Sequence, residues 1–397
     1  MKDSTLYLVR LGEISLKGLN RDFFEKRLKL NIKAKLKPYR TVVSKQKGRL
    51  YFEISNECPE EQAQKAFRTT FGVVGFSKCI RCEKDMDIIK ANATLLIKEE
   101  PFASGTGTFK SETRRADKQF PLSSYEIDCE LGGVVLSAYP EMKVNAKYPD
   151  KTIFCEIRDK AYLYTSPQPG PGGLPVNTAG KGMLLLSGGI DSPVASYRMA
   201  QRGLKQECIY FHAAPYTSEQ ALQKVEKLAS LIAPYLQGTR LHVVPFTDVQ
   251  LWIRDHSPED EHTLMFRAAM MKVANAISLM QDGSAIVTGE ALAQVASQTL
   301  ESMVFTDSMS DQLVLRPLVG MDKQEIMDIA KKIGTYETSI LPYEDCCIIF
   351  SPKHPLVRPN KRSVTAHFEA MEIEELLEKA IEDTKTVDFG PDGNRRE

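Results

Sequence analysis

The stretch that decides the fold is Met183-Leu184-Leu185-Leu186-Ser187-Gly188-Gly189-Ile190-Asp191-Ser192, followed directly by Pro193. Its apolar first half predicts a short buried strand, its glycines predict a tight loop, and Asp191 or Ser192 is expected to cap a helix that has Pro193 in its first turn. Such a helix start presents unpaired backbone N–H groups and the positive end of the helix dipole. The stretch therefore predicts an anion site, and a phosphate-handling enzyme is the first hypothesis.

This loop differs from the two best-known phosphate-binding loops. A Walker loop needs a lysine and a hydroxyl residue after its second glycine, but the nearby pair Gly180-Lys181 precedes the strand. A dinucleotide fingerprint needs a third glycine in a fixed pattern, and here the pattern stops after two. A strand-to-helix turn without a ligand is the simpler interpretation of the glycines alone. The whole string from Ser187 to Ser192, however, resembles the Ser-Gly-Gly-X-Asp-Ser signature of the PP-loop ATP pyrophosphatases, which split ATP between its α and β phosphates and transfer AMP.

The charges of the chain are unevenly distributed, although its formal net charge is zero. Residues 1–165 contain 30 Lys and Arg against 22 Asp and Glu, and the remainder contains 22 against 30. Within residues 1–50 the count is 14 against 4. A solvated basic helix over 20–37, with one apolar side facing a core, explains part of the excess. An asymmetry of this size favours nucleic acid as the partner, bound through its phosphates and released by salt.

Length and cysteine usage indicate a reduced, cytoplasmic, multidomain protein. At about 150 residues per domain, 397 residues predict two or three domains. No apolar run approaches the roughly 20 residues of a membrane helix, and the opening residues do not resemble a signal peptide. The eight cysteines are irregularly spaced, as expected for free thiols. Cys79 and Cys82 form a Cys-X-X-Cys pair without two further ligands at suitable spacing, so we expect no metal site there.

Periodicity and composition divide the chain into three units and a linker. Residues 1–60 predict a small α+β domain, and residues 61–165 predict a second domain. Residues 166–180 are rich in Pro and Gly, which is typical of a linker. Strands and helices alternate over 181–397, which predicts an α/β domain with a doubly wound parallel sheet. The expected strands are 183–187, 206–211, 240–246, 284–288 and 313–316, and the expected helices are 192–202, 217–236, 262–281 and 322–333.

Several motifs carry a resemblance to one family. They are Gly12-Glu13-Ile14-Ser15-Leu16-Lys17-Gly18, Arg114-Arg115-Ala116-Asp117-Lys118, Leu184 to Ser196, Thr288-Gly289-Glu290, Gln294-Val295-Ala296-Ser297-Gln298 and Leu341-Pro342-Tyr343-Glu344-Asp345-Cys346-Cys347. With these motifs the chain resembles the tRNA 4-thiouridine synthetases (tRNA uridine 4-sulfurtransferases) over nearly its full length. The resemblance implies an amino-terminal ferredoxin-like domain, a THUMP RNA-binding domain and a PP-loop ATP pyrophosphatase domain. It is expected to be the short form, without the rhodanese domain that some members carry.

The resemblance also implies a reaction and its partners. In the family, ATP adenylates O4 of the uridine at position 8 of tRNA, and a cysteine persulfide then delivers sulfur to the activated carbon. A pyridoxal-phosphate cysteine desulfurase supplies the persulfide, and Mg²⁺ accompanies ATP. Some relatives also supply sulfur for thiazole and thiamine synthesis. Analogy with the family adds a homodimer as the expected assembly.

Two adjacent cysteines are the candidate sulfur carriers. Cys347 is the expected persulfide carrier, and Cys346 is the second choice or a resolving thiol. A thiolate acts as a nucleophile only when it is accessible and low in pKa. The acidic residues just before the pair would not lower a thiol pKa, so Lys353 or His354 would have to supply positive charge. Cys208, in a predicted strand, is a third option that is better explained as core.

Further residues are assigned one by one from the resemblance. Ligands of parallel sheets bind beyond the carboxyl ends of the strands, where the loop is expected. Asp191 is expected to act in catalysis through Mg²⁺. A surface arginine, a turn glycine and a solvated amide are the simpler interpretations of Arg267, Gly289 and Gln298. The expected nucleotide-binding residues are Leu185, Leu186, Ser187, Gly188, Gly189, Asp191, Ser192, Tyr210, Phe211, Arg267, Gly289 and Gln298, and the expected tRNA-binding residues are Lys110, Arg114, Arg115 and Lys118.

Two other classes of function remain open from the sequence. A different PP-loop adenylating enzyme that acts on a small substrate would leave the basic amino-terminal half without a purpose. A non-catalytic tRNA-binding protein would have no need of the intact Ser-Gly-Gly-Ile-Asp-Ser string. ATP/pyrophosphate exchange with and without tRNA separates these alternatives.

Overall fold

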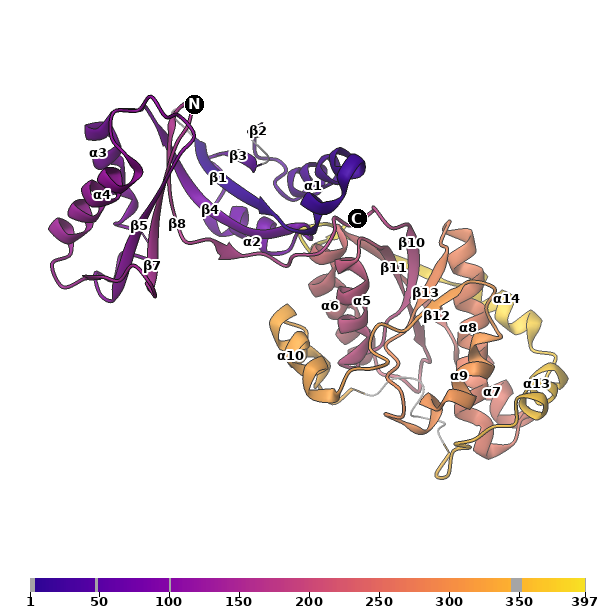
Figure 1. The fold of residues 1–397 in the computed structure, drawn as a ribbon. Helices are drawn as coiled ribbons and strands as arrows, with labels where there is room; N and C mark the ends of the chain where they lie inside the picture. The colour runs from indigo at the N-terminus through magenta and orange to yellow at the C-terminus, as the bar shows by residue number, and fades with distance from the viewer. Residues whose placement is uncertain (1–3, 47–48, 100, 344–351, 397) are drawn as a thin grey trace. The chain divides into compact units, whose positions relative to one another are not determined.

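The computed structural model describes residues 4–46, 49–99, 101–343 and 352–396, which belong to two compact units (Figure 1). The first unit contains residues 1–18 and 36–172, and the second contains residues 19–35 and 173–397. In the part of the chain that the structure describes, no helix has the length and apolar character needed to cross a membrane.

The first unit is built on one nine-stranded sheet. Its strand order is β2-β3-β1-β4-β8-β7-β5-β6, and β9 pairs with β4. The strands are β1 (Ser4–Leu11), β2 (Thr41–Gln46), β3 (Arg49–Ser55), β4 (Val73–Cys82), β5 (Thr108–Arg115), β6 (Lys143–Val144), β7 (Lys151–Ile157), β8 (Ala161–Thr165) and β9 (Gln168–Pro169). Because β4 pairs with both β1 and β8, strands from the two expected amino-terminal domains form one continuous sheet.

Three helices pack on this sheet and build its core. In α2 (Glu60–Arg68), Phe67 contacts the rings of Tyr7, Phe52 and Phe76, with centroids 5.1 to 5.6 Å apart. Helices α3 (Met86–Leu96) and α4 (Ser124–Ala138) cover β5, β7 and β8 with buried aliphatic side chains. A capping box that starts at Ser123 opens α4 and pairs two of its otherwise unbonded N–H groups. The 3₁₀ turns η1 (Glu13–Leu16) and η2 (Gly18–Asn20) follow β1.

The second unit contains a seven-stranded sheet in the order β14-β13-β10-β11-β12-β15-β16. The strands are β10 (Lys181–Leu185), β11 (Lys205–His212), β12 (Thr239–Pro245), β13 (Ala285–Val287), β14 (Leu313–Leu315), β15 (Lys385–Phe389) and β16 (Arg395–Arg396). The strands from β14 to β12 are parallel, whereas β15 is antiparallel to β12. The expected doubly wound parallel sheet is confirmed, and the antiparallel extension at one edge was not expected.

Helices cover both faces of this sheet (Figure 1). Helices α5 (Asp191–Gln201) and α6 (Glu219–Leu236) pack together, and the opposite face carries α7 (Thr247–His256), α8 (His262–Met280) and α14 (Glu374–Glu382) over a core that includes Met183, Ile209 and Val244. The remaining elements are η3 (Glu259–Glu261), η4 (Ala296–Gln298), α9 (Leu300–Asp307), α10 (Lys323–Ile333), α11 (Tyr336–Ser339) and α13 (Lys361–Ala370). Asp322 caps α10, and Gly334 ends it with a left-handed φ of 76° that a side chain would disfavour.

The basic helix α1 (Arg21–Lys35) packs with the second unit, although its sequence falls within the expected 1–60 domain. Its Leu28 and Ile32 are fully buried, and the Asn31 side chain donates a hydrogen bond to the carbonyl of Val176 at 3.1 Å. The chain around residue 176 was expected to be a linker and instead gives this helix a packing partner. Residues 19–35 therefore pack with a part of the chain that lies far away in the sequence. The domain boundaries at 60, 165 and 180 stay a prediction.

Candidate functional site

The loop between β10 and α5 is held closed by its own hydroxyl groups. The backbone N–H of Ser187 donates to Oγ of Ser192 at 2.9 Å, and the two Oγ atoms lie 3.1 Å apart. The N–H of Gly189 donates to Oγ of Ser187 at 3.3 Å. The residue at the N-cap is Ile190, for which the structure shows no side-chain capping bond among the described residues. The expected cap by Asp191 or Ser192 is therefore wrong, because both lie in the first helical turn.

Gly289 is required by the packing of β13 against α5. A Cβ atom at this position would lie 2.7 Å from the backbone nitrogen of Ser192 and 2.9 Å from its Cα. Real Cβ atoms do not approach backbone so closely, so a side chain here would push the loop after β13 away from the first turn of α5. Gly289 was expected to bind the nucleotide, which stays a prediction, and in the structure the neighbour that comes close to it is the start of α5.

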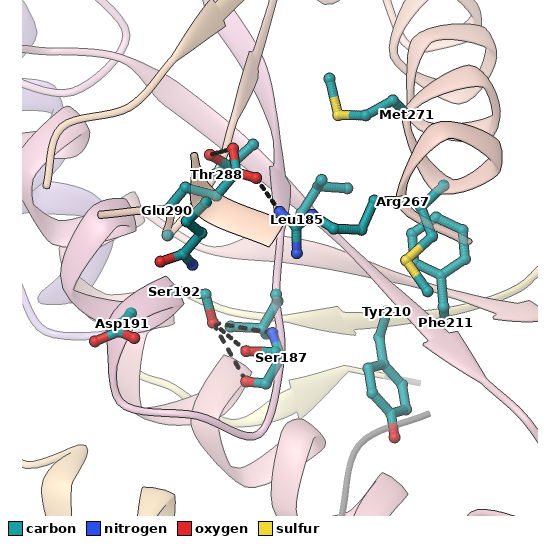
Figure 2. A pocket seen from close by; sticks show the side chains of 14 residues that line it. Leu185, Ser187, Asp191, Ser192, Tyr210, Phe211, Arg267, Met271, Thr288 and Glu290 are labelled. Atoms are coloured by element: carbon teal, nitrogen blue, oxygen red, sulfur yellow. Dashed lines mark hydrogen bonds and ion pairs between the residues drawn. The ribbon is translucent and has the colours of Figure 1, made fainter. Parts of the chain in front are cut away.

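A pocket opens at the carboxyl ends of the parallel strands (Figure 2). Most of the nucleotide-binding residues expected from the sequence line it together, and Thr288, Glu290, Met270 and Met271 complete its wall. Gly188 and Gly189 are the expected residues that are not among those lining it, although they belong to the adjoining loop. The expected residues in the wall are Leu185, Leu186, Ser187, Asp191, Ser192, Tyr210, Phe211, Arg267, Gly289 and Gln298. Their roles toward a ligand stay predictions.

Buried charges support one side of the pocket. The carboxylate of Glu290, 3% exposed, forms ion pairs with the guanidinium groups of Arg267 and Arg316 and accepts a hydrogen bond from Thr288 at 2.9 Å. Burial alone would raise the pKa of Glu290, but the two guanidinium groups and the hydrogen bonds lower it below its usual value. Arg316 also pairs with Asp307. Arg267 is thus held inside the pocket wall rather than on the surface.

Two polar atoms at the pocket lack a hydrogen-bond partner within the described ranges. They are Nε of Arg267 and Oε1 of Gln298, both buried. Gln298 is 8% exposed, so the solvated-amide interpretation does not hold. Buried polar atoms without partners are rare because each loses its hydrogen bonds to water. Both atoms belong to residues that line the pocket.

Asp191 meets residues that the sequence did not bring together. Its Oδ1 lies 2.6 Å from Nζ of Lys323, and its Oδ2 accepts a hydrogen bond from the Gln294 amide at 2.9 Å. Its side chain keeps 21% exposure at the open side of the loop. No sequence signal pointed to Lys323, since it follows the cap of α10, far from the loop along the chain.

Tyr210 and Phe211 lie at the end of β11, where both line the pocket. The Phe211 ring also packs edge-on against Phe246, with centroids 4.8 Å apart, and is 6% exposed. Phe211 therefore belongs partly to the core, while the strand end that carries it faces the pocket (Figure 2).

The proposed sulfur carriers, Cys346 and Cys347, lie outside the described residues. Lys353 and His354, which follow them, are exposed. Cys208 is completely buried, and this burial raises its pKa to about 12, so its thiol is protonated and inaccessible at neutral pH. Its interpretation as core agrees with this burial.

The thiols of Cys79 and Cys82 on β4 are also protonated. Burial raises the pKa of Cys79 to about 12 and that of Cys82 to about 11. Over residues 4–343 and 352–396, apart from the few that are not described, no group of three or more His, Cys, Asp or Glu side chains is arranged to hold a metal ion.

The four residues expected to bind tRNA differ in their surroundings. Lys110 and Arg114 on β5 flank Glu112 and pair with it at 3.1 and 2.9 Å, and Arg114 keeps 67% exposure. Lys118 is exposed in the following turn. The Arg115 guanidinium instead donates to main-chain carbonyls at residues 120 and 122 of its own unit. Phe109 and Phe120 are buried in the core of this unit.

Known proteins match this chain over most of its length. The sequence profile of the thiamine biosynthesis protein (ThiI) matches residues 177–373, that of the ThiI ferredoxin-like domain matches 6–77, and that of the THUMP domain matches 83–166. A probable tRNA sulfurtransferase from Acetivibrio thermocellus is 44% identical over 382 residues, which cover 96% of this chain and 97% of the relative. A second, from Geobacillus thermodenitrificans, is 44% identical over 96% of this chain and 94% of the relative.

Solved structures agree with these matches. A crystal structure of a 4-thiouridine synthetase–RNA complex with bound ATP superimposes with a TM-score of 0.89 at 35% identity, and covers 97% of this chain and all of the other. PH1313 from Pyrococcus horikoshii gives a TM-score of 0.63 at 25% identity over 83% of this chain and 99% of the other. The resemblance inferred from the motifs, including the ferredoxin-like, THUMP and PP-loop organisation, is confirmed. The chain belongs to the ThiI family of thiamine biosynthesis proteins.

Proposed function

We propose that the protein is an ATP-dependent tRNA sulfurtransferase that converts the uridine at position 8 of tRNA into 4-thiouridine. The observation that carries the proposal is the pocket, which is lined by the first residues of α5 and by Arg267 and Gln298, whose Nε and Oε1 atoms are buried without a hydrogen-bond partner among the described residues. A family relative with 35% identity and the same fold is a 4-thiouridine synthetase that was solved with RNA and ATP. Relatives with 44% identity carry the name tRNA sulfurtransferase.

The loop at 187–192 is suited to the first half of the reaction. Backbone N–H groups and the dipole of α5 attract the β and γ phosphates, and O4 of the uridine attacks the α phosphorus. The bond to the β phosphate breaks, and pyrophosphate leaves with negative charge that the same N–H groups stabilise. The AMP group on O4 turns a poor leaving group into a good one. Arg267 and Gln298, which also line the pocket, orient the nucleotide.

Magnesium fits the loop through Asp191. Its carboxylate is partly exposed beside the helix start, and carboxylate oxygens are ligands that Mg²⁺ prefers. When bound, the ion would neutralise charge on the phosphates. In this structure the Asp191 carboxylate accepts hydrogen bonds from Lys323 and Gln294. The ammonium group of Lys323 therefore adds a positive charge next to the loop, beside the positive end of the α5 dipole. Asp191 and Lys323 together make this side of the loop selective for a nucleotide polyphosphate.

The second half of the reaction needs a thiolate, and we assign it to Cys347 with Cys346 as the second thiol. The terminal sulfur of the Cys347 persulfide attacks C4, and AMP leaves. A resolving thiol then attacks the Cys347 sulfur, which breaks its bond to the transferred sulfur, leaves that sulfur on C4 and forms a protein disulfide. An external reductant reduces this disulfide and restores the two thiols. Cys208 and Cys155 do not compete for this role, because burial raises their pKa values to about 12.

The partners follow from this chemistry. A cysteine desulfurase supplies the persulfide sulfur, and the same persulfide serves thiazole synthesis as a second outlet. We propose that Lys110, Arg114 and Lys118 hold tRNA phosphates, that two copies of the chain assemble, and that the protein works in the cytoplasm with its tRNA. The exposed guanidinium of Arg114 supports the tRNA site, since it can exchange its pair with Glu112 for a phosphate.

Reconstitution tests the proposal. Purified protein is incubated with tRNA, ATP, Mg²⁺, cysteine, a cysteine desulfurase and a reductant, and 4-thiouridine is measured by mass spectrometry of digested tRNA. We expect the product at position 8 and its loss when ATP or tRNA is omitted. ATP/pyrophosphate exchange that is independent of tRNA, with no thiolated product, would instead favour an enzyme for a small substrate.

A further inference from the structure

A buried lysine ties the chain just before residue 344 to helix α6. Lys224 is 7% exposed, and its Nζ donates hydrogen bonds to the carbonyl oxygens of Leu341 at 2.8 Å and Tyr343 at 3.3 Å. Burial of an ammonium group is costly unless hydrogen bonds replace its water. An aliphatic side chain would fill the same place on α6 without that cost. We therefore infer that Lys224 is present to bind the segment at residues 341–343 and not to stabilise helix α6.

The same segment is also tied to the phosphate loop. Ser339, the last residue of α11, is 6% exposed, and its Oγ donates a hydrogen bond to the carbonyl of Gly189 at 3.2 Å. The backbone of Thr335, just before α11, donates to the carbonyl of Ala330 in α10, the helix that begins with Lys323. Residues 339–343 are thus held between the loop and α6 by side chains that are almost completely buried.

We propose that Lys224 and Ser339 are positioning residues for the sulfur-transfer half of the reaction. Together they hold residues 339–343 against the phosphate loop, so that the chain beyond Tyr343 starts at a fixed place relative to the adenylated uridine. This inference rests on the proposed function, in which the sulfur carrier lies at Cys346 or Cys347, three and four residues beyond Tyr343. Neither Lys224 nor Ser339 touches the substrate in this scheme.

The expected effect follows from the dependence of rate on geometry. A bound nucleophile reacts fast because its position is set in advance, and a displacement of about 1 Å lowers the rate by about 100-fold. Adenylation takes place at the loop, whereas the bonds of Lys224 to Leu341 and Tyr343 lie in the segment that follows Ser339. Loss of the anchor should therefore slow sulfur transfer while adenylation continues. A purely structural lysine would instead affect both steps, or stability alone.

Four variants of the full chain separate these outcomes. Lys224→Met removes the donor, Lys224→Arg keeps donors for carbonyls, and Ser339→Ala removes the contact to the loop. Lys227→Met is the matched control, because Lys227 lies on the same helix three residues later and is exposed. Adenylation is measured as tRNA-dependent pyrophosphate release without a sulfur donor, together with KM for ATP. Sulfur transfer is measured as the single-turnover rate of 4-thiouridine formation with a desulfurase and cysteine.

We expect Lys224→Met to slow 4-thiouridine formation by 10- to 100-fold, with pyrophosphate release and KM for ATP within twofold of wild type. Lys224→Arg should recover most of the rate, Ser339→Ala should slow it several-fold, and Lys227→Met should match wild type. Equal rates of thiolation in Lys224→Met and wild type, or an equal loss of adenylation and thiolation, would overturn the proposal. If Lys224→Met does not fold, Ser339→Ala decides in the same way, because it removes a single hydroxyl. A wild-type protein that makes no 4-thiouridine would refute the proposed function itself.

Discussion

Glu290 offers the sharpest test of the pocket, because one buried carboxylate organises the wall that faces the nucleotide. It pairs with Arg267 and Arg316 and accepts from Thr288. We predict that Glu290→Gln, which keeps the shape and removes the charge, leaves two guanidinium groups without their shared partner. The loss of one member of a buried ion pair costs about 3–5 kcal/mol. At about 2–4 °C per kcal/mol for a unit of this size, Tm should fall by about 6–20 °C.

The substitution should also weaken ATP binding. Arg267, which lines the pocket, would lose the partner that holds its guanidinium group in place, and a hydrogen bond to a charged group contributes about 1.5–3 kcal/mol. KM for ATP in pyrophosphate exchange should therefore rise about 10- to 100-fold, measured below the Tm of the variant. Because the pKa of Glu290 is lowered, its contribution to the stability of the fold depends on pH. Because folding lowers this pKa, the carboxylate stabilises the protein above about pH 4.3, its unfolded value, and less as pH falls below it.

Unfolding of the second unit has its own fluorescent probe. The chain has a single tryptophan, Trp252 on α7, whose Nε1 donates to the carbonyl of Met371 at 2.8 Å. Its ring stacks on His256 with centroids 3.8 Å apart, so unfolding should change its emission. Glu374→Gln is the control: it removes an exposed carboxylate paired with Lys272 and should cost less than about 1 kcal/mol. A Glu290→Gln protein with the Tm of that control and an unchanged KM for ATP would refute this account of the pocket wall.

Three further predictions concern the two half-reactions, the RNA surface and acid stability. Asp191→Ala should abolish tRNA-dependent ATP/pyrophosphate exchange, whereas Cys347→Ser should keep the exchange and lose 4-thiouridine; normal thiolation by a Cys346→Ser, Cys347→Ser protein contradicts the assigned carrier. The double variant Arg114→Glu, Lys118→Glu should weaken tRNA binding and lower the slope of log K against log salt by up to about 2, as measured by filter binding at several salt concentrations. Arg115 is left intact because it donates hydrogen bonds to main-chain carbonyls. An unchanged slope would place the RNA elsewhere. Burial raises the pKa of Glu207, but its bonds with His242 and Lys181 lower the pKa to about 2. Glu207 should therefore contribute at most about 3 kcal/mol to the free energy of unfolding, fully above about pH 4.3 and progressively less toward pH 2. Glu207→Gln should remove that part of the acid-unfolding curve, and identical curves for the variant and the wild type would disprove it.

Local sequence was sufficient wherever one element carried the signal. The apolar run before Ser187, the two glycines and Pro193 predicted β10, the loop and α5, because strand burial and helix starts depend on neighbouring residues. Asp322 and Gly334 marked both ends of α10 for the same reason. The edge strand β15 and helices α13 and α14 were not expected, since their short patterns resemble many solvent-exposed segments.

The site followed from sequence only in part. The motifs placed Arg267, Gly289 and Gln298 in the nucleotide pocket through family resemblance, and the structure brings all three to its wall. Their physical partners were not readable from the motifs. Glu290 binds Arg267, Ser192 crowds Gly289, and Lys323 pairs with Asp191. Each of these contacts joins residues from separate elements.

By itself the sequence determined the phosphate loop, the alternating strands and helices of the second unit, the basic amino-terminal half and the family. These depend on residue type and on spacing along the chain. Only the tertiary structure decided that α1 packs with the second unit, that Arg115 is bound within its own unit, and that Lys224 and Ser339 hold residues 339–343 against the loop. The physical reason is that burial and hydrogen-bond partners are set by packing between distant segments. A lysine on a helix has the same local sequence whether its ammonium faces water or two main-chain carbonyl groups of a distant segment.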